Sequence, residues 1–164
     1  MATKENLEAA FAGESQANRK YLAFARKADE EGHPQVAKLF RAAAEAETIH
    51  AHNHLKALNG IGSTRENLIE AVAGETHEFK TMYPEMIAIA KEEKETVALR
   101  SFMWANSVEK VHAGLYTTAL DRLGNAIEDV EYYICPLCGH TVAGSPPMTC
   151  PFCGEDGSKF YTVG

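Results

Sequence analysis

Small and aromatic side chains recur three, four and seven residues apart along the first three quarters of the chain, a spacing that places them on one face of an α-helix. Gly, Pro and Asn interrupt this pattern in short stretches, at residues 31–34 and 58–60. The sequence therefore predicts four long helices, at residues 4–31, 34–58, 63–93 and 95–123. Four such helices with short connections are typical of a helix bundle.

Local signals support the helix boundaries. Pro34 suits the first turn of the second helix, because an N–H has no helical partner there. Ser63 and Glu66 form a capping box ahead of the third helix. Pro84 lies inside the third helix, so we expect a kink or a local break in hydrogen bonding. If the two hairpins face each other, the link between the second and third helices must cross the bundle.

The composition changes near Gly124, where Ala, Glu, Lys and Leu give way to Gly, Pro, Cys and Thr. The last segment has the short strands and turns of a small β-rich module, and it is too short for a full hydrophobic core of its own. We expect a boundary within residues 124–131, with a helical domain at residues 1–128 and a metal-dependent module at residues 129–164. The predicted fold class is mainly α, a four-helix bundle followed by this module.

Charge and hydropathy exclude several classes of function. The chain has 164 residues, a hydrophobic fraction of 45% and a formal net charge of -7. This acidic balance argues against binding a nucleic-acid backbone. No apolar run is long enough to span a bilayer, and the N-terminal residues do not resemble a signal peptide. We therefore expect a cytoplasmic protein.

Two sequence fragments occur twice in the same order. AGES and ETIHA, at residues 12–15 and 47–51, are matched by AGET and EKVHA at residues 73–76 and 109–113. Glu47 follows Glu14 by 33 residues, and Glu109 follows Glu75 by 34. Each acid lies among small or aromatic residues on the inward face of its predicted helix. Unpaired buried carboxylates would cost several kcal/mol each, so these four must either share a cation or not be buried.

A histidine accompanies the second acid of each repeat. His50 follows Glu47 by three residues, and His112 follows Glu109 by three, so one helical turn presents a carboxylate beside an imidazole. A single Glu from each of two helices, with a Glu-x-x-His pair from each of the other two, is typical of di-iron and di-manganese bundles. The mixed oxygen and nitrogen ligands favour iron or manganese. Each repeat is therefore interpreted as half of a two-metal site.

The repeat differs at one position. Glu78 follows Glu75 by three residues, whereas Ala17 occupies the matching place after Glu14. A fifth carboxylate would make the two metals inequivalent and would permit one to exchange ligands; alternatively, Glu78 only supports the ligands or lies on the surface. The remaining histidines are not expected to bind metal: His33, His52, His54, His77 and His140.

The four cysteines form two Cys-x-x-Cys pairs in the last segment: Cys135, Cys138, Cys150 and Cys153. Such a four-thiolate set binds zinc or a single iron, and its clustering argues against disulfides. By spacing alone a structural zinc site is the commoner solution. A one-electron iron carrier has an obvious use beside a two-metal redox site, and this context favours iron.

These motifs together resemble the rubrerythrin family. FAGESQANRKY, AEAETIHA, GETHEFKTMYPEM and EKVHAGLY occur in order, followed by YICPLCG and CPFCG. The resemblance covers essentially the whole chain. It implies a ferritin-like four-helix domain with a non-haem di-iron centre, a rubredoxin-like Fe(Cys)4 domain and a homodimer. It also implies a peroxidase that reduces hydrogen peroxide to water and protects against oxidative stress.

The resemblance also assigns roles to individual residues. Glu47 and Glu109 would bridge the two irons, and the iron near Glu14 would move between Glu78 when oxidised and His50 when reduced. Two tyrosines match family residues that hydrogen-bond the ligand carboxylates, Tyr21 and Tyr83. The residues that match the family's di-iron ligands are Glu14, Glu47, His50, Glu75, Glu78, Glu109 and His112.

The resemblance further implies how electrons arrive. An external NAD(P)H-linked donor or a rubredoxin would refill the Fe(Cys)4 centre. Because a long bundle should separate the two metal sites of one chain, the electron is expected to cross to the partner of a head-to-tail homodimer. A ferroxidase that uses oxygen is the first alternative, and the cysteine module counts against it. A non-catalytic protein with a zinc ribbon as a docking module is the second.

Overall fold

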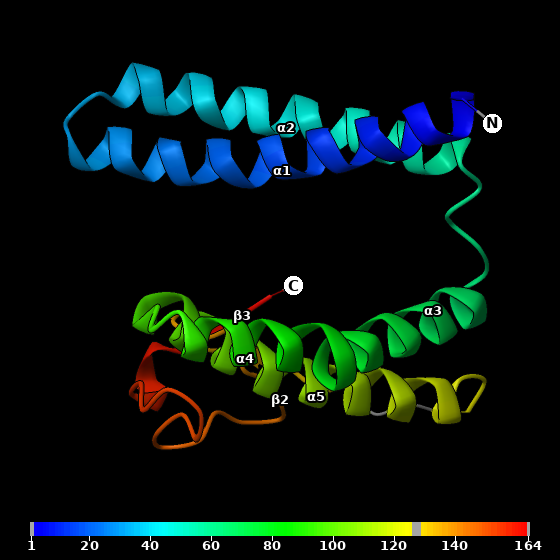
Figure 1. The fold of residues 1–164 in the computed structure, drawn as a ribbon, viewed down its shortest axis with the longest axis vertical. Helices are drawn as coiled ribbons and strands as arrows, with labels where there is room; N and C mark the ends of the chain where they lie inside the picture. Colours follow the sequence, from blue (N-terminus) through cyan, green and yellow to red (C-terminus); the bar gives the residue numbers. More distant parts are fainter. Residues whose placement is uncertain (1, 126–128, 164) are drawn as a thin grey trace. The chain divides into compact units, whose positions relative to one another are not determined.

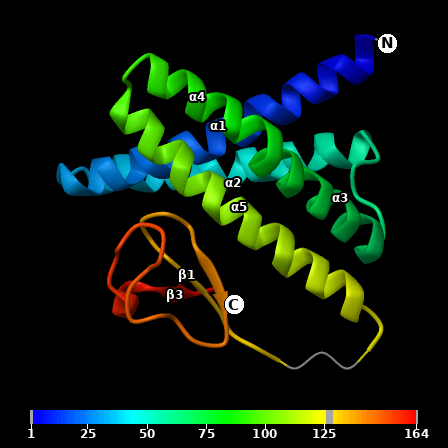
Figure 2. The same ribbon diagram turned by 60° about the horizontal axis from the view of Figure 1, so that its bottom comes forward.

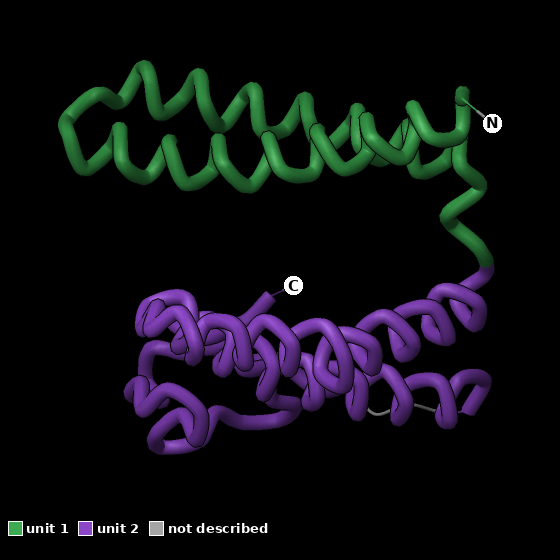
Figure 3. The backbone as a smooth tube through the Cα atoms, in the orientation of Figure 1, with its two compact units in different colours: residues 1–62 green, residues 63–164 purple. Residues whose placement is uncertain are grey.

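The computed structural model of the protein describes residues 2–125 and 129–163. These residues form two compact units, one ending at Gly62 and one beginning at Ser63 (Figure 3). The predicted boundary between residues 128 and 129 adjoins residues 126–128, which lie outside the described part of the chain, so it stays a prediction. The C-terminal module belongs to the second unit because strand β2 (Thr141–Ala143) contacts helix α5 (Thr96–Arg122).

The first unit is a hairpin of two long helices, α1 (Ala2–Glu30) and α2 (Pro34–Ala57) (Figure 1). The turn between them contains Gly32 in the left-handed region, with φ of 79°. The buried Asn18 side chain joins the helices, because its Nδ2 donates to the Ala44 carbonyl and to Thr48 Oγ1, both at 2.7 Å. Among the described residues of this unit, the buried apolar side chains are all alanine, which lets the two helices approach closely: Ala25, Ala28, Ala37, Ala44 and Ala51.

The second unit begins with a helical run that pairs with α5 (Thr96–Arg122). The run consists of α3 (Thr64–His77), a π-helical turn (Glu78–Met82) and α4 (Tyr83–Glu92). The predicted capping box is confirmed: Ser63 Oγ accepts from the Glu66 N–H at 3.3 Å, and the Ser63 N–H donates to the Glu66 carboxylate at 2.7 Å. The four predicted helical regions are therefore present, the third in three segments.

The π-helical turn is the local break in hydrogen bonding expected at Pro84. Proline has no N–H and its ring crowds the preceding turn of a regular α-helix. The chain widens here, and the Tyr83 N–H bonds to the Glu78 carbonyl, five residues back. Such turns concentrate at functional sites because they redirect the side chains around them. Here the widened turn begins at Glu78, the extra acid of the second repeat.

The C-terminal module contains β1 (Tyr132–Ile134), β2 (Thr141–Ala143), a short 3-10 helix (Gly157–Lys159) and β3 (Tyr161–Thr162). The three strands form an antiparallel sheet in the order β2-β1-β3, and the module lies beside α5 (Figure 2). Its small core is built around Cys135, Cys150 and Phe160. The predicted fold class, mainly α with a small β-rich module at the end, is confirmed. Among the described residues, no helix is both long and apolar enough to cross a membrane.

Candidate metal centres

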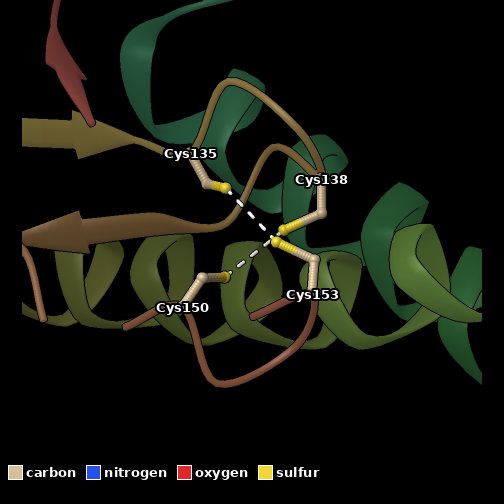
Figure 4. Close-up of side chains that lie close together, drawn as sticks. All are labelled: Cys135, Cys138, Cys150 and Cys153. Carbon is tan, nitrogen blue, oxygen red and sulfur yellow. Dashed lines mark hydrogen bonds between the residues drawn. The ribbon is translucent and has the colours of Figure 1, made fainter. Parts of the chain in front are cut away.

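The four cysteines converge at one point of the C-terminal module (Figure 4). Cys135 Sγ lies 3.6 Å from Cys153 Sγ, and Cys138 Sγ lies 3.6 Å from Cys150 Sγ. Four sulfurs placed tetrahedrally at about 2.3 Å from one metal ion would be about 3.8 Å apart. The observed spacing therefore fits a tetrahedral metal ion, and all four thiols are free of disulfides.

Two similar turns build this cluster. The Gly139 N–H donates to the Cys135 carbonyl, and the Gly154 N–H donates to the Cys150 carbonyl, each at 3.0 Å. Both glycines have left-handed backbones, with φ of 81° and 80°, which a side chain would oppose. Each Cys-Pro-x-Cys-Gly segment thus turns two sulfurs toward the same point. This cluster could be predicted from the sequence because each of the two turns is encoded by five consecutive residues.

The donor chemistry of the cluster also calls for a cation. Burial and the neighbouring thiols raise the pKa of the Cys138 thiol well above its ordinary value. Burial likewise raises the pKa of Cys153. Without a metal, four thiolates in this small core would repel one another, and a bound cation removes that conflict. The residues therefore fit the Fe(Cys)4 centre implied by the motifs.

The first carboxylate group lies in the first unit. One ligand atom each from Glu14, Glu47 and His50 lies within 4.8 Å of the others. His50 Nδ1 is 2.8 Å from the Glu47 carboxylate, one helical turn away. The His50 side chain is 55% exposed and that of Glu47 is 19% exposed. We call this set half-site 1.

The second carboxylate group repeats this arrangement in the second unit. Ligand atoms of Glu75, Glu109 and His112 lie within 4.8 Å of one another. His112 Nδ1 is 2.8 Å from the Glu109 carboxylate and 3.9 Å from that of Glu75. The three side chains are only 17–26% exposed. We call this set half-site 2.

Ionising the carboxylates of half-site 2 together is unfavourable, as their raised pKa values show. Burial, a hydrogen bond with Glu109 and the charge of Glu109 raise the pKa of Glu75 to about 7, against an opposing effect of His112. Burial also raises the pKa of Glu109, and the charge of Glu78 adds to it. Neighbouring carboxylates in a poorly hydrated place resist ionising together unless a cation joins them. These residues fit the metal centre that the repeat predicted.

Glu78 and Tyr83 border half-site 2. The charge of Glu78 raises the pKa of both Glu75 and Glu109, so the extra carboxylate lies near the group, although it is not among the three converging ligands. Burial and the charges of Glu78, Glu109 and Glu75 raise the pKa of the Tyr83 hydroxyl. Tyr21, in the first unit, packs its ring against Phe24 and Phe40. The ligand role of Glu78 and the tyrosine hydrogen bonds stay predictions.

Thr141 connects the cysteine module to half-site 2. His112 Nε2 lies 2.9 Å from Thr141 Oγ1, and Thr141 Oγ1 donates to the Gly139 carbonyl at 3.1 Å. The Thr141 hydroxyl oxygen therefore accepts a hydrogen bond from the Nε2 N–H of His112, which leaves Nδ1 as the nitrogen available to a metal. Gly139 in turn donates to Cys135. The expectation that the helices separate the two metal sites of one chain is wrong for half-site 2, because the module contacts His112 directly.

Sequence reasoning missed Thr141, since no periodicity relates residue 141 to residue 112. The histidines set aside as non-ligands are outside the converging ligand groups of the described residues. His140 is the buried one: its ring packs edge-on against Phe152, with centroids 4.7 Å apart, and its Nδ1 has no hydrogen-bond partner among the described residues. The side chains of His33, His52 and His77 are exposed, and that of His54 is half-buried.

Comparisons with known proteins agree with this geometry. The sequence model of the rubrerythrin family matches residues 5–120. Rubrerythrin-2 of Clostridium acetobutylicum is 36% identical over 96% of this chain and 95% of that protein. Nigerythrin of Nitratidesulfovibrio vulgaris is 37% identical over 93% of this chain and 82% of that protein.

Solved structures extend the similarity to the fold. Nigerythrin in its fully reduced, all-ferrous state is 35% identical and superimposes with a TM-score of 0.61, covering 98% of this chain and 86% of that one. Nigerythrin in a partially reduced state gives the same values.

Proposed function

Because the chain belongs to the rubrerythrin family, we propose that it is a non-haem di-iron peroxidase that reduces hydrogen peroxide to water. Members of the family carry a di-iron site and a four-cysteine iron site, and this chain has the Glu/His and four-cysteine ligand groups for both. An iron-dependent oxidoreductase role follows from family membership. The peroxide substrate, the electron relay, a cytoplasmic location and the protection against oxidative stress belong to the proposal.

The two half-sites would together hold the iron pair. Glu47 and Glu109 would bridge, while Glu14 and Glu75 would each bind one side. Glu78 and His50 would alternate as ligands of the iron that Glu14 holds. Iron held by these residues would supply the two electrons that reduce one hydrogen peroxide to two waters. Cys135, Cys138, Cys150 and Cys153 would hold the third iron.

The carboxylates have a second task, because each peroxide needs two protons to become two waters. One of the site carboxylates could deliver these protons to the departing oxygens when it is not bound to iron. The Nε2 N–H of His112 is not aimed at the iron site for this task, because it donates a hydrogen bond to Thr141 Oγ1.

The observation that carries the proposal is the hydrogen bond between His112 and Thr141, 2.9 Å long. It joins the four-cysteine module to the Glu/His group through Thr141, Gly139 and the Cys135 carbonyl. A chain of hydrogen bonds between two redox centres supports one-at-a-time electron return. A ferroxidase that deposits mineral does not need such a path for electrons. The donor to the module would be an external NAD(P)H-linked reductase or a rubredoxin.

Stopped-flow absorbance tests the proposal. Iron-loaded, fully reduced protein is mixed anaerobically with hydrogen peroxide, and a second sample is mixed with oxygen. We expect the visible bands of the oxidised Fe(Cys)4 centre to return rapidly with peroxide and slowly with oxygen. Fast return with oxygen alone would instead indicate a ferroxidase. Absence of any visible band would mean that the cysteines hold zinc, and the relay would be refuted.

A further inference from the structure

The first repeat carries one more imidazole than the second. Seven residues after Glu47 the chain has His54, whereas seven residues after Glu109 it has Tyr116. His54 also follows His50 by four residues. Accepting the di-iron function proposed above, we infer that His50 and His54 form a capture site for a divalent metal ion, which is then transferred to half-site 1.

Helix α2 is continuous around these histidines, so it fixes where their side chains leave the helix. At about 100° per residue, Glu47, His50 and His54 lie within about 60° of one another around the helix axis. His52 lies on another side of α2, where it lines a pocket together with Phe11 of α1. Glu47, His50 and His54 therefore form a row of ligands on consecutive turns, and His52 lies outside that row.

One ring nitrogen of His50 is free to bind an ion. Nδ1 lies 2.8 Å from the Glu47 carboxylate, and within the described part of the chain no hydrogen bond to Nε2 is present. A carboxylate that accepts the Nδ1 proton of a histidine leaves Nε2 as the metal-binding nitrogen and orients the ring. The corresponding nitrogen of His112 is occupied, because it donates to Thr141 Oγ1.

Two histidines four residues apart on one helix are a known way to hold a metal ion, as in helical zinc sites. Imidazole nitrogens suit ferrous iron as well as zinc, nickel and copper. His54 lies outside the three converging ligands of half-site 1, so the pair offers two protein ligands where half-site 1 offers three. The pair should therefore hold an ion more weakly than half-site 1 and release it to that site.

Exposure supports a role in uptake. The His50 side chain is 55% exposed and that of His54 is half-buried, whereas that of Glu47 is only 19% exposed. An ion from solvent therefore meets the histidines before the more enclosed carboxylate. When the ion moves to half-site 1, Glu47 binds it directly and the proton of His50 moves from Nδ1 to Nε2. The transfer exchanges ligands without changing the oxidation state of the ion.

Copper is the probe for the captured ion, because the electron paramagnetic resonance spectrum of Cu²⁺ reports the nitrogens bound to it. Untagged full-length protein with zinc in the cysteine cluster receives a substoichiometric amount of Cu²⁺. We expect a species with two coupled nitrogens, since half-sites 1 and 2 contain one histidine each. His54→Gln should remove this species, and the matched control His52→Gln should retain it.

The rate of metal loading tests the transfer. Co²⁺ is mixed in a stopped-flow instrument with the same zinc-containing protein, and its visible absorbance is followed. His54→Gln should slow loading by about 10-fold. The final amount of bound cobalt should equal that of the wild type, because Glu14, Glu47 and His50 remain. His52→Gln should load at the wild-type rate, and circular dichroism checks that both variants keep their helices.

Two results would overturn the inference and leave the di-iron proposal intact. One is loading of His54→Gln at the wild-type rate, and the other is a wild-type copper spectrum with a single coupled nitrogen. Wild-type protein that binds neither cobalt nor iron outside the cysteine cluster would instead refute the di-iron function, and the capture site with it.

Discussion

Half-sites 1 and 2 are built from the same repeated motif, yet their surroundings differ. In both, a Glu and a His lie one helical turn apart, with Nδ1 2.8 Å from the carboxylate. The His50 side chain is 55% exposed, whereas that of His112 is 26% exposed and is held through Nε2 by Thr141. The local motif thus fixes the ligand types, and the neighbouring elements fix hydration, charge and orientation.

Three features of half-site 2 have no counterpart in half-site 1. Glu78 occupies the position where the first repeat has Ala17, and a π-helical turn begins there. The cysteine module contacts His112 from the other side. Half-site 2 gathers three carboxylates where water is partly excluded. It therefore depends on a bound cation more strongly than half-site 1 does. This asymmetry suits a centre whose two metals perform different tasks.

The largest expected effect tests the proposed electron relay from the cysteine module to half-site 2. Cys138→Ser removes one thiolate of the module. Loss of supporting residues around a metal costs about 10–100-fold, so loss of a ligand should lower turnover by more than about 100-fold. A single stoichiometric oxidation of the di-iron site should persist. Peroxide consumption with reductant measures turnover, and single-turnover absorbance measures the stoichiometric oxidation. Met148→Ala, at a 94% exposed position of the same module, is the control; full turnover by the Cys138 variant would contradict the relay.

The next effect concerns the extra carboxylate. Glu78→Ala makes the second repeat match the first, which has Ala17. We expect one of the two irons to bind about 10–100-fold more weakly, since a ligand or its support is lost. Anaerobic iron titration should then show two separate affinities. The exposed Glu85, in the first turn of α4, provides the control variant Glu85→Ala. Unchanged binding of both irons would place Glu78 outside the site.

A smaller effect is expected from Thr141→Val, which keeps the shape of the side chain and removes the hydroxyl. His112 loses the acceptor of its Nε2 proton. The return of electrons to the di-iron site should slow by about 10-fold, measured as the recovery of the Fe(Cys)4 bands after one equivalent of peroxide. Thr118→Val removes an exposed hydroxyl that bonds only within α5 and should leave the rate unchanged. Equal rates in both variants would exclude this contact from the relay.

The smallest effect is a pH dependence of the metal-free protein. The pKa of Glu75 rises from 4.5 to about 7 in the fold, so the folded state binds this proton more tightly than the unfolded state. The stabilising contribution is complete below pH 4.5 and is lost as pH rises through about 7. The melting temperature of metal-free protein should therefore fall between about pH 5 and pH 8. Glu75→Gln should flatten this slope, and an unaltered slope would assign it to other groups.

Local sequence signals predicted most of the helices and the cysteine cluster. The capping residues Ser63 and Glu66, the break at Pro84 and the paired Cys-Pro-x-Cys-Gly turns each act within a few residues, so their geometry is readable from the chain. The grouping of acids and histidines followed from helical periodicity.

The contact between residues 112 and 141 could not be read in this way. It depends on which surface of α5 the small module packs against. A contact between residues so far apart in the sequence produces no periodic pattern from which it could be predicted. The division of the helices into two units also escaped prediction, because helical periodicity shows which face of a helix is apolar but not which helix covers it.

The buried Asn18 has a consequence for assembly of the metal centre. Its amide bonds to Ala44 and Thr48, the residues on either side of Glu47 along α2. Sliding α1 by one turn would displace Glu14 by about 5.4 Å and would leave this amide without partners, as a single buried Asn does when it fixes the alignment of paired helices. Asn18 therefore fixes the alignment of α1 with α2 along their axes. This alignment keeps Glu14 at the level of Glu47, so that both ligands are in position before an ion binds.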